Sequence, residues 1–320
     1  MRLVPLLLLL PFFAVAQVPA KIPKVCLLAF DPPDLVRSRF NLFFQGLREL
    51  GYVEGRNIAI EIRAADSVPA KYPALARECV QSQADVIVAT TTPAAQAAKQ
   101  ATTTIPIVMN PLGDPLGTGL VKSLARPEGN ITGLTFMAPT LAAKRLSLLK
   151  EALPQLSRVL VLSHLVDPIA PLQVAAMRRV AQSLGMELHV HDIRTAEDYA
   201  RGFEAGKRAK VEAVIVTSES ISFVNRAQIM ELVARYRLPS MLWSLAFVEG
   251  GALMGYMPDF SVFSPRTAYY VDRILKGAKP SELPIEQPTK FIFAVNLKTA
   301  KALGISIPQP VLLRADKIIE

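Results

Sequence analysis

Residues 85–100, DVIVATTTPAAQAAKQ, and residues 105–114, IPIVMNPLGD, indicate the fold of this chain. The run 86–89 is short, continuous and rich in β-branched residues, as in a parallel strand that is covered on both faces. Hydroxyl residues followed by Pro93 mark a helix start, and an Ala-rich run continues to residue 101. Residues 105–109 form the next expected strand. This unit predicts an open parallel α/β sheet.

The same alternation of strands and helices continues along the chain. We expect strands at 24–30, 58–62, 86–89, 105–109, 130–135, 158–162, 187–191, 213–217, 239–243, 252–256 and 290–295. We expect helices at 40–50, 72–83, 93–101, 116–124, 141–153, 172–184, 196–209, 225–237, 265–276 and 297–303. The pattern restarts after residue 154. It therefore predicts an α/β fold with two doubly wound parallel-sheet lobes.

A hinge with a ligand cleft is expected between these lobes. Lobe one should comprise residues 24–136 plus 258–289, and lobe two residues 137–257 plus 290–320. Short crossing segments near Phe136 and Met257 should join them, with the C-terminal portion bridging both lobes.

The first 17 residues, MRLVPLLLLLPFFAVAQ, have the pattern of a secretory signal peptide. One positive charge precedes a short apolar core, and a small-x-small site predicts cleavage after Ala16. The apolar run is too short to span a membrane comfortably. No cysteine directly follows it, so we expect no lipid anchor. The mature protein should be soluble and periplasmic.

The formal net charge is +9, and the basic residues are spread along the chain rather than clustered. This distribution is typical of a solvated surface, although it also suits an anionic ligand, a membrane surface or an acidic partner. An exported protein is poorly placed to meet nucleic acid. We therefore expect no nucleic-acid partner.

Cys26 and Cys79 would enter an oxidising compartment. Cys26 lies in the first expected strand, and Cys79 lies in the helix that crosses over it in a 2-1-3 strand order. Helix and sheet backbones usually stand too far apart for disulfide geometry. We therefore expect two buried free thiols, with a disulfide bridge as the alternative.

Polar residues follow the expected strands, and ligands bind at that edge of open α/β sheets. Candidate ligand-binding residues of lobe one are Asp31, Thr90, Thr91, Thr92, Asn110 and Asp114. Those of lobe two are Ser163, His164, Ser218, Glu219, Ser220 and Ser244, with Tyr256 and Phe247 as an aromatic wall. Most of these side chains also suit a turn or helix-cap role. As a set they suit a small polar or zwitterionic molecule.

Two of these roles are specific hypotheses. Thr92, at a helix N-terminus, is expected to hold an anionic group of the ligand. Asp114 or Glu219 is expected to receive a ligand amine. Trp243 is expected to be a core residue.

Signals for an enzyme or a cofactor are weak. No nucleophile elbow, phosphate-binding loop or zinc-protease motif occurs. His189 and His191 share one face of a strand but make an incomplete metal site. Asp31, Asp114 and Glu219 are conceivable as an acid–base set. We expect no cofactor, no metal and no catalysis.

Several motifs occur in the order in which they appear in a known family. They are GLRELGYVEGRN at 46–57, DVIV at 85–88, TPAAQAAKQA at 92–101, GDP at 113–115, LARPEGNITG at 124–133, KRLSLLKEALP at 144–154, FVEGGALMGY at 247–256 and NLKTAKALG at 296–304. Together they resemble the ABC-transporter substrate-binding proteins that include tryptophan-binding members, with a class I periplasmic-binding-protein fold. The resemblance extends from about residue 24 to residue 320.

The resemblance implies a monomeric protein that closes on a small molecule and delivers it to an ABC permease in the inner membrane. The chain departs from the family in the expected cleft loops. Thr90-Thr91 replace a glycine-rich turn, and His164 replaces a common Asn. Serines flank Glu219, Leu245-Ala246 replace a charged pair, and Met257 replaces a glycine. These changes argue against assuming tryptophan as the ligand.

Two other functions remain open from the sequence. An exported sensor module that reports its ligand to a membrane receptor would have the same cleft. An exported α/β enzyme would need a convergent acid–base set, which the sequence does not clearly show. A cytoplasmic repressor is disfavoured by the signal peptide and by the lack of a DNA-binding helix pair before the first strand.

Overall fold

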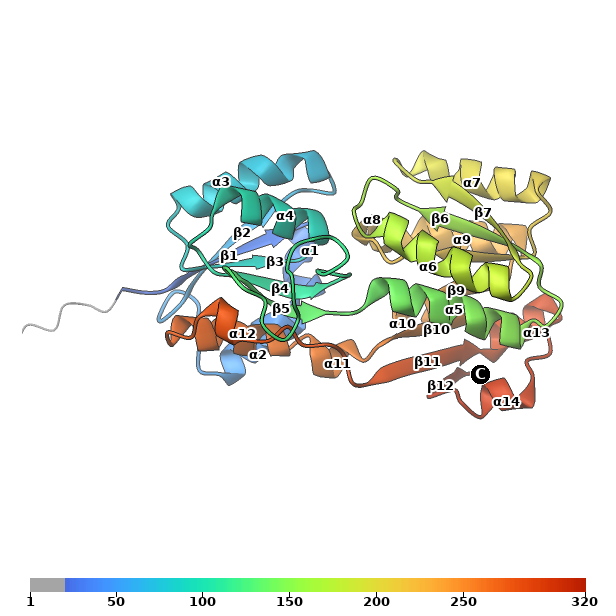
Figure 1. Ribbon diagram of the computed structural model, residues 1–320. Coiled ribbons are helices and arrows are strands. Elements are labelled where there is room, and N and C mark those ends of the chain that lie inside the picture. Colours follow the sequence, from blue (N-terminus) through green and yellow to red (C-terminus); the bar gives the residue numbers. More distant parts are fainter. Residues whose placement is uncertain (1–20) are drawn as a thin grey trace, which may run out of the picture.

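The computed structural model describes residues 21–320, which form two α/β lobes side by side (Figure 1). The expected signal peptide, residues 1–16, lies outside the described residues. None of the described helices is long and apolar enough to cross a membrane.

Lobe one is built on a sheet of five parallel strands in the order β2-β1-β3-β4-β5. This confirms the expected 2-1-3 order. The strands are β1 (Lys24–Ala29), β2 (Ala59–Ala64), β3 (Val86–Ala89), β4 (Ile107–Leu112) and β5 (Ile131–Thr135). Its helices are α1 (Pro33–Arg39), α2 (Asn41–Glu49), α3 (Tyr72–Gln81) and α4 (Thr92–Ala101).

Apolar side chains cover both faces of this sheet. Helices α3 and α4 pack on one face, and α2 and α12 (Arg266–Leu275) pack on the other. All four residues of β3 are fully buried, which explains the continuous apolar run in the sequence.

Lobe two has a seven-stranded sheet in the order β12-β11-β10-β9-β8-β6-β7. Its strands are β6 (Arg158–Ser163), β7 (Glu187–Asp192), β8 (Ala213–Val216), β9 (Ser240–Leu242), β10 (Met254–Pro258), β11 (Phe291–Asn296) and β12 (Lys317–Ile319). Strand β11 runs antiparallel to β10, whereas the other pairs are parallel. The expected two-lobed parallel-sheet fold is thus confirmed, with one antiparallel pair added in lobe two.

Nine helices complete the described chain after residue 137, in addition to α12. They are α5 (Ala138–Ala152), α6 (Ala170–Ser183), α7 (Glu197–Arg208), α8 (Ser220–Val224), α9 (Arg226–Tyr236), α10 (Leu245–Glu249), α11 (Phe260–Phe263), α13 (Leu297–Leu303) and α14 (Gln309–Leu312).

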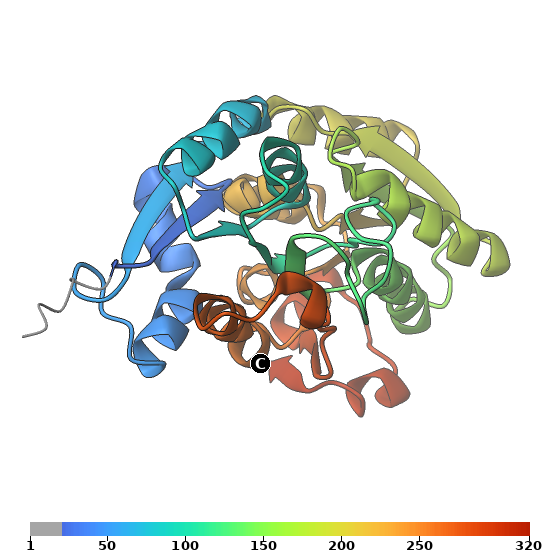
Figure 2. The ribbon, with the colours of Figure 1, turned by 60° about the vertical axis from the view of Figure 1, so that its left-hand side comes forward.

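The chain passes between the lobes three times, after β5, after β10 and before β11 (Figure 1). Two of these segments lie side by side, because the N–H of Asp259 donates to the carbonyl of Lys290 at 3.0 Å. The segment before β11 also pairs with the end of β5 in lobe one, because the N–H of Thr135 donates to the carbonyl of Glu286 at 2.9 Å. Helix α12 lies against α2 of lobe one in both views (Figures 1 and 2). On these contacts we propose that the expected lobe boundaries hold.

Some expected elements differ from the structure. The helix expected at 116–124 is absent from the described chain, where turns occur instead. The carboxylate of Asp114 accepts from the N–H of Gly117 at 2.9 Å, and Gly119 has φ of +70°. These two features fold the segment into tight turns rather than a helix. Helix α1 was not expected, although Pro33 at its first position is a helix-start signal.

Cys26 and Cys79 form a disulfide, so the expectation of two free thiols was wrong. Helix α3 lies directly over β1 and brings the two Cα atoms to 5.7 Å. That spacing is ordinary for a disulfide. Both cysteines are fully buried in the core between the sheet and α3.

Replacing both cysteines, Cys26→Ala with Cys79→Ala, should lower the free energy of unfolding by about 2–4 kcal/mol. The disulfide joins residues 53 positions apart and so restricts the unfolded chain. Urea denaturation followed by circular dichroism measures the change. A reductant should shift the wild-type midpoint and leave the variant unchanged. Equal stability of the two proteins would contradict the prediction.

Candidate functional site

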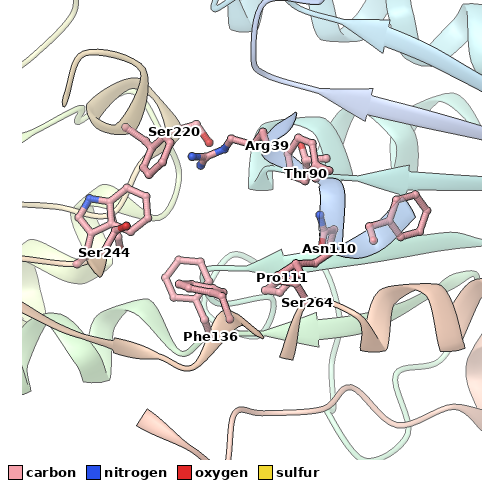
Figure 3. A pocket seen from close by; sticks show the side chains of 15 residues that line it. Arg39, Thr90, Asn110, Pro111, Phe136, Ser220, Ser244 and Ser264 are labelled. Carbon is pink, nitrogen blue, oxygen red and sulfur yellow. The ribbon is translucent and has the colours of Figure 1, made fainter. Parts of the chain in front are cut away.

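In the described part of the chain, residues of both lobes line two of the cavities. The first, which we call the aromatic cavity, has a volume of about 270 Å³ (Figure 3). It is lined by Arg39, Phe40, Leu42, Phe43, Thr90, Asn110, Pro111, Phe136, Ser218, Ser220, Phe223, Trp243, Ser244, Phe260 and Ser264. The second cavity, of about 350 Å³, is lined by Phe30, Pro69, Ala70, Thr91, Pro93, Gln96, His164, Val166, Asp167, Pro168, Glu219, Ser220 and Ile221. Both lobes contribute to each cavity, and Ser220 borders both.

Arg39, the last residue of α1, connects the two lobes across the aromatic cavity. Its guanidinium carbon lies 3.5 Å from the ring centre of Phe223 in α8. Its Nε lies 3.4 Å from Oδ1 of the buried Asp31. Burial lowers the pKa of Arg39 to about 10, and the charge of Asp31 acts in the opposite direction. Arg39 therefore stays a cation at neutral pH, stacked on an aromatic ring of the other lobe.

Thr90 and Asn110 line the aromatic cavity near Arg39 (Figure 3). The hydroxyl of Thr90 donates to the carbonyl of Leu28 at 3.2 Å, which leaves its oxygen as an acceptor. Oδ1 of Asn110 accepts from the hydroxyl of Thr267 at 2.8 Å. The amide nitrogen of Asn110, which is on the side of Thr90, belongs to the cavity lining (Figure 3). Asn110 and Arg39 thus present hydrogen-bond donors to an occupant.

Aromatic rings form the lobe-two wall of this cavity. The ring centres of Phe223 and Trp243 are 5.8 Å apart, and the buried Phe247 packs behind them at 6.3 and 5.9 Å. The indole N–H of Trp243 donates to the hydroxyl of Ser222 at 3.1 Å. Its polar group is thus engaged inside the protein, and Trp243 contributes an apolar surface to the cavity.

The crossing segments form another wall. Phe136 and Phe260 pack edge to face with ring centres 6.4 Å apart, and both line the cavity. They follow β5 and β10, at the points where the chain leaves each lobe. A ligand in the aromatic cavity would therefore contact both lobes and the segments that join them.

Glu219 belongs to a buried network between the two cavities. Its Oε1 accepts from Nε2 of Gln173 at 2.9 Å. The hydroxyl oxygen of Thr217 lies 2.7 Å from Oε2 of Glu219 and 3.1 Å from the carbonyl oxygen of Leu162. One hydroxyl hydrogen cannot serve both oxygens, so a protonated Glu219 that donates to Thr217 satisfies all three groups.

Burial, together with the charge of the nearby Asp167, raises the pKa of Glu219 to about 8. Burial likewise raises the pKa of Asp167 to about 6. Both the hydrogen-bond pattern and the burial thus favour a neutral Glu219 at pH 7.

The residues predicted from the sequence divide into three groups. Thr90, Asn110, Ser218, Ser220 and Ser244 line the aromatic cavity. Thr91, His164, Glu219 and Ser220 line the second cavity. Asp31, Thr92, Asp114, Ser163 and Tyr256 line neither cavity.

The third group has other contacts. Asp31 pairs with Arg39, and Asp114 accepts from Gly117 within its own turn. Thr92 and Ser163 are buried, and the N-cap hydroxyl of α4 belongs to Thr91, which accepts from the N–H of Ala94 at 3.2 Å. Pro93 is thus the second helical residue rather than the first. Tyr256 stacks on Phe291 with ring centres 5.6 Å apart.

Sequence reasoning missed Arg39, Phe223, Phe136 and Phe260, which define the cavity. Arg39 ends a helix that the Pro33 signal could have identified. Phe223 lies in α8, a helix of five residues that is too short to give a clear hydrophobic period. Trp243 was expected in the core, and it is both buried and part of the cavity lining.

Within residues 21–320, no group of three His, Cys, Asp or Glu side chains is arranged to hold a metal ion. Nε2 of His189 lies 3.3 Å from the carboxylate of Glu187 on the same strand, and the ring of His191 packs against Gly202. Neither histidine borders the two interlobe cavities.

Comparison with known proteins identifies related chains. The model of the family described as "ABC transporter substrate binding protein" matches residues 34–319. A protein of Clostridioides difficile (strain R20291) named "Tyrosine-binding protein" is 25% identical over 263 residues, which are 82% of this chain and 75% of that protein.

Two solved structures share both fold and sequence. A conserved domain protein from Vibrio cholerae has 28% identity and a TM-score of 0.86, with 93% of this chain and 100% of that chain covered. An ABC domain from Streptococcus pneumonia in complex with L-Trp has 26% identity and a TM-score of 0.84, with 93% and 99% covered. These similarities confirm the resemblance drawn from the motifs.

The contribution of Glu219 to the free energy of unfolding should fall as the pH rises from about 4.5 to about 8. Glu219 binds its proton more tightly in the folded chain than in the unfolded chain, so its contribution is fully present below pH 4.5 and is lost as the pH passes about 8. The slope from this group is at most about 1.4 kcal/mol per pH unit. Glu219→Gln, which imitates the neutral carboxyl, should flatten the curve in urea denaturation. If the free energy of unfolding depended on pH in the same way for the wild type and Glu219→Gln, Glu219 would not be neutral in the folded protein.

Proposed function

Since the chain belongs to the ABC transporter substrate binding protein family, we propose that it captures a small carboxylate-bearing molecule between its lobes for import. The observation that carries this proposal is the joint construction of the aromatic cavity. Arg39 and Asn110 come from lobe one, Phe223 and Trp243 come from lobe two, and Phe136 comes from a crossing segment. Such a cavity exists only while the lobes are together.

The chemistry of the lining suggests the ligand. The guanidinium of Arg39 and the amide of Asn110 suit a carboxylate, which a guanidinium can bind through two parallel hydrogen bonds. Phe223, Trp243 and Phe136 suit a flat apolar body. A volume of about 270 Å³ accommodates a molecule of the size of an aromatic amino acid. Relatives named for tyrosine or solved with L-Trp support this size class.

Contacts between the lobes support hinge closure as the capture step. Ile221 and Val224 of α8 pack against the core of lobe one. Gly113 of lobe one lies so close to Ile169 of lobe two that a Cβ at Gly113 would come within 2.4 Å of Cγ1 of Ile169. The ligand need only favour this closed state by a few kcal/mol to shift a hinge that has two states.

The cellular setting is part of the proposal. The signal-peptide pattern of residues 1–16 supports export to the periplasm, and the Cys26–Cys79 disulfide suits an oxidising compartment. There the closed protein, as a monomer, would present its two lobes to an ABC permease in the inner membrane. Its role is binding rather than catalysis.

A thermal-shift screen of residues 17–320 tests the function directly. The screen would include aromatic acids, amino acids, nucleosides and sugars. A ligand at a hundred times its dissociation constant should stabilise the protein by about 2.7 kcal/mol. Small-angle scattering with and without the ligand should show a more compact closed form, and the compound should be recovered unchanged. A screen without any binder, or conversion of the bound compound, would contradict the proposal.

Arg39→Gln should weaken ligand affinity at least tenfold, or about 1.4 kcal/mol. The variant loses the only cation among the described residues that line the aromatic cavity. The affinity of Arg39→Lys should lie between those of the wild type and Arg39→Gln, because lysine keeps the charge beside Asp31 but lacks the planar donor group. Arg37→Gln is the matched control, since Arg37 lies on the same helix and pairs with Glu54 at the surface. Isothermal titration calorimetry measures each affinity, and equal losses for Arg37→Gln and Arg39→Gln would count against the role of Arg39.

Gly113→Ala should weaken binding by hindering closure. The added Cβ would collide with Ile169 only when the lobes meet, so the melting temperature without ligand should change little. Combining it with Ile169→Ala removes the obstructing side chain and should restore part of the affinity. Calorimetry on the two single variants and the double variant gives the coupling. Purely additive losses would mean that the two residues do not oppose each other during closure.

A further inference from the structure

We propose that the ligand is an aromatic carboxylate without an ammonium group, rather than an amino acid. This inference rests on the proposed function and specifies the ligand of the same cavity. It follows from the charge of the cavity lining and from the contacts of the acidic residues around it.

The described lining of the aromatic cavity contains one charged residue, the cation Arg39. The other polar lining residues are Thr90, Asn110 and four serines, and all of them are neutral. A ligand carboxylate would accept a charge-assisted hydrogen bond from the Arg39 guanidinium. A ligand ammonium would enter a small, mostly apolar space beside a like charge.

Asp31 is the acidic residue nearest to Arg39, and it already has a role. Its carboxylate is buried behind Arg39, with Oδ1 3.4 Å from Nε of that residue, and it does not line the cavity. If an ammonium recruited Asp31, Arg39 would lose its partner within the protein. Asp31 therefore stabilises the cationic form of Arg39 rather than offering a second site for an ammonium group.

The two acidic residues expected to receive an amine are also engaged elsewhere. Both carboxyl oxygens of Glu219 have partners, Gln173 and Thr217, and Glu219 borders only the second cavity. The carboxylate of Asp114 accepts from Gly117 in a turn away from both cavities. In the second cavity, Asp167 accepts from the N–H of Ile169 at 3.1 Å.

The energetic consequence is a preference between two molecules that differ by one group. An ammonium group that enters the cavity loses its hydration free energy, and without a carboxylate partner no interaction of similar strength replaces it. The deaminated acid, which has the same ring and carboxylate but no ammonium group, does not pay this desolvation cost. The cavity should therefore select against aromatic amino acids and for the corresponding deaminated acids.

Calorimetry on the full mature chain with three matched compounds tests this selection. The compounds are phenylpropionate, L-phenylalanine, which adds an ammonium group, and phenylethylamine, which lacks the carboxylate. Phenylpropionate should bind at least tenfold more tightly than L-phenylalanine, and phenylethylamine should not bind. The series of hydroxyphenylpropionate, L-tyrosine and tyramine should show the same order.

The outcomes separate this inference from the proposed function. Equal or tighter binding of the amino acids would overturn the ligand class while the binding function stands. Binding of the amines would overturn it as well. If none of the six compounds bound, the ligand class would again be wrong, and the broader thermal-shift screen would decide whether the protein binds small molecules at all.

Two variants probe the mechanism of selection. Ser244→Asp places a carboxylate in the lining at the start of α10, a position where Asp is well tolerated. It should narrow or reverse the preference between phenylpropionate and L-phenylalanine. Glu219→Gln should leave the affinity for phenylpropionate within twofold. A selective loss of L-phenylalanine binding in Glu219→Gln would show that Glu219 receives the ammonium, against the inference.

Discussion

The carboxyl ends of the parallel strands in the two sheets meet at the interlobe space, and this constraint places the polar residues of the site. Thr90 follows β3 and Asn110 lies near the end of β4, while Ser218 and Ser244 follow β8 and β9. Each residue needs only to come at the end of a buried strand to reach the cavity. The three crossing segments then hold the two edges opposite each other and add Phe136 and Phe260.

Much of the fold was predictable because buried strands and amphipathic helices leave strong patterns. The strand at 86–89 and the helix at 297–303 have the expected bounds, and the restart after residue 154 corresponds to β6, the first strand of lobe two. Short elements such as α8 and α10 were missed because five residues carry too little periodicity. The helix predicted at 116–124 was wrong because the Asp114 side chain stabilises a turn there, although the apolar pattern of the segment favours a helix.

The site was less predictable because its main features are contacts between distant segments. The strand-end rule selected Thr90, Asn110, Ser218, Ser220 and Ser244, all of which line the aromatic cavity. It could not reveal that Arg39 stacks on Phe223, since nearly two hundred positions and two lobes separate them. Nor could it show which carboxylates have partners inside the protein. The role of these strand-end residues in ligand binding stays a prediction.

Trp243 has a consequence beyond packing. It is the only tryptophan in the chain, and it lies in the wall of the aromatic cavity with its N–H held by Ser222. All indole emission from this protein therefore originates at one place, where water gives way to an occupant when the lobes close. The protein carries its own optical reporter, and it could serve as a label-free sensor for whatever molecule it captures.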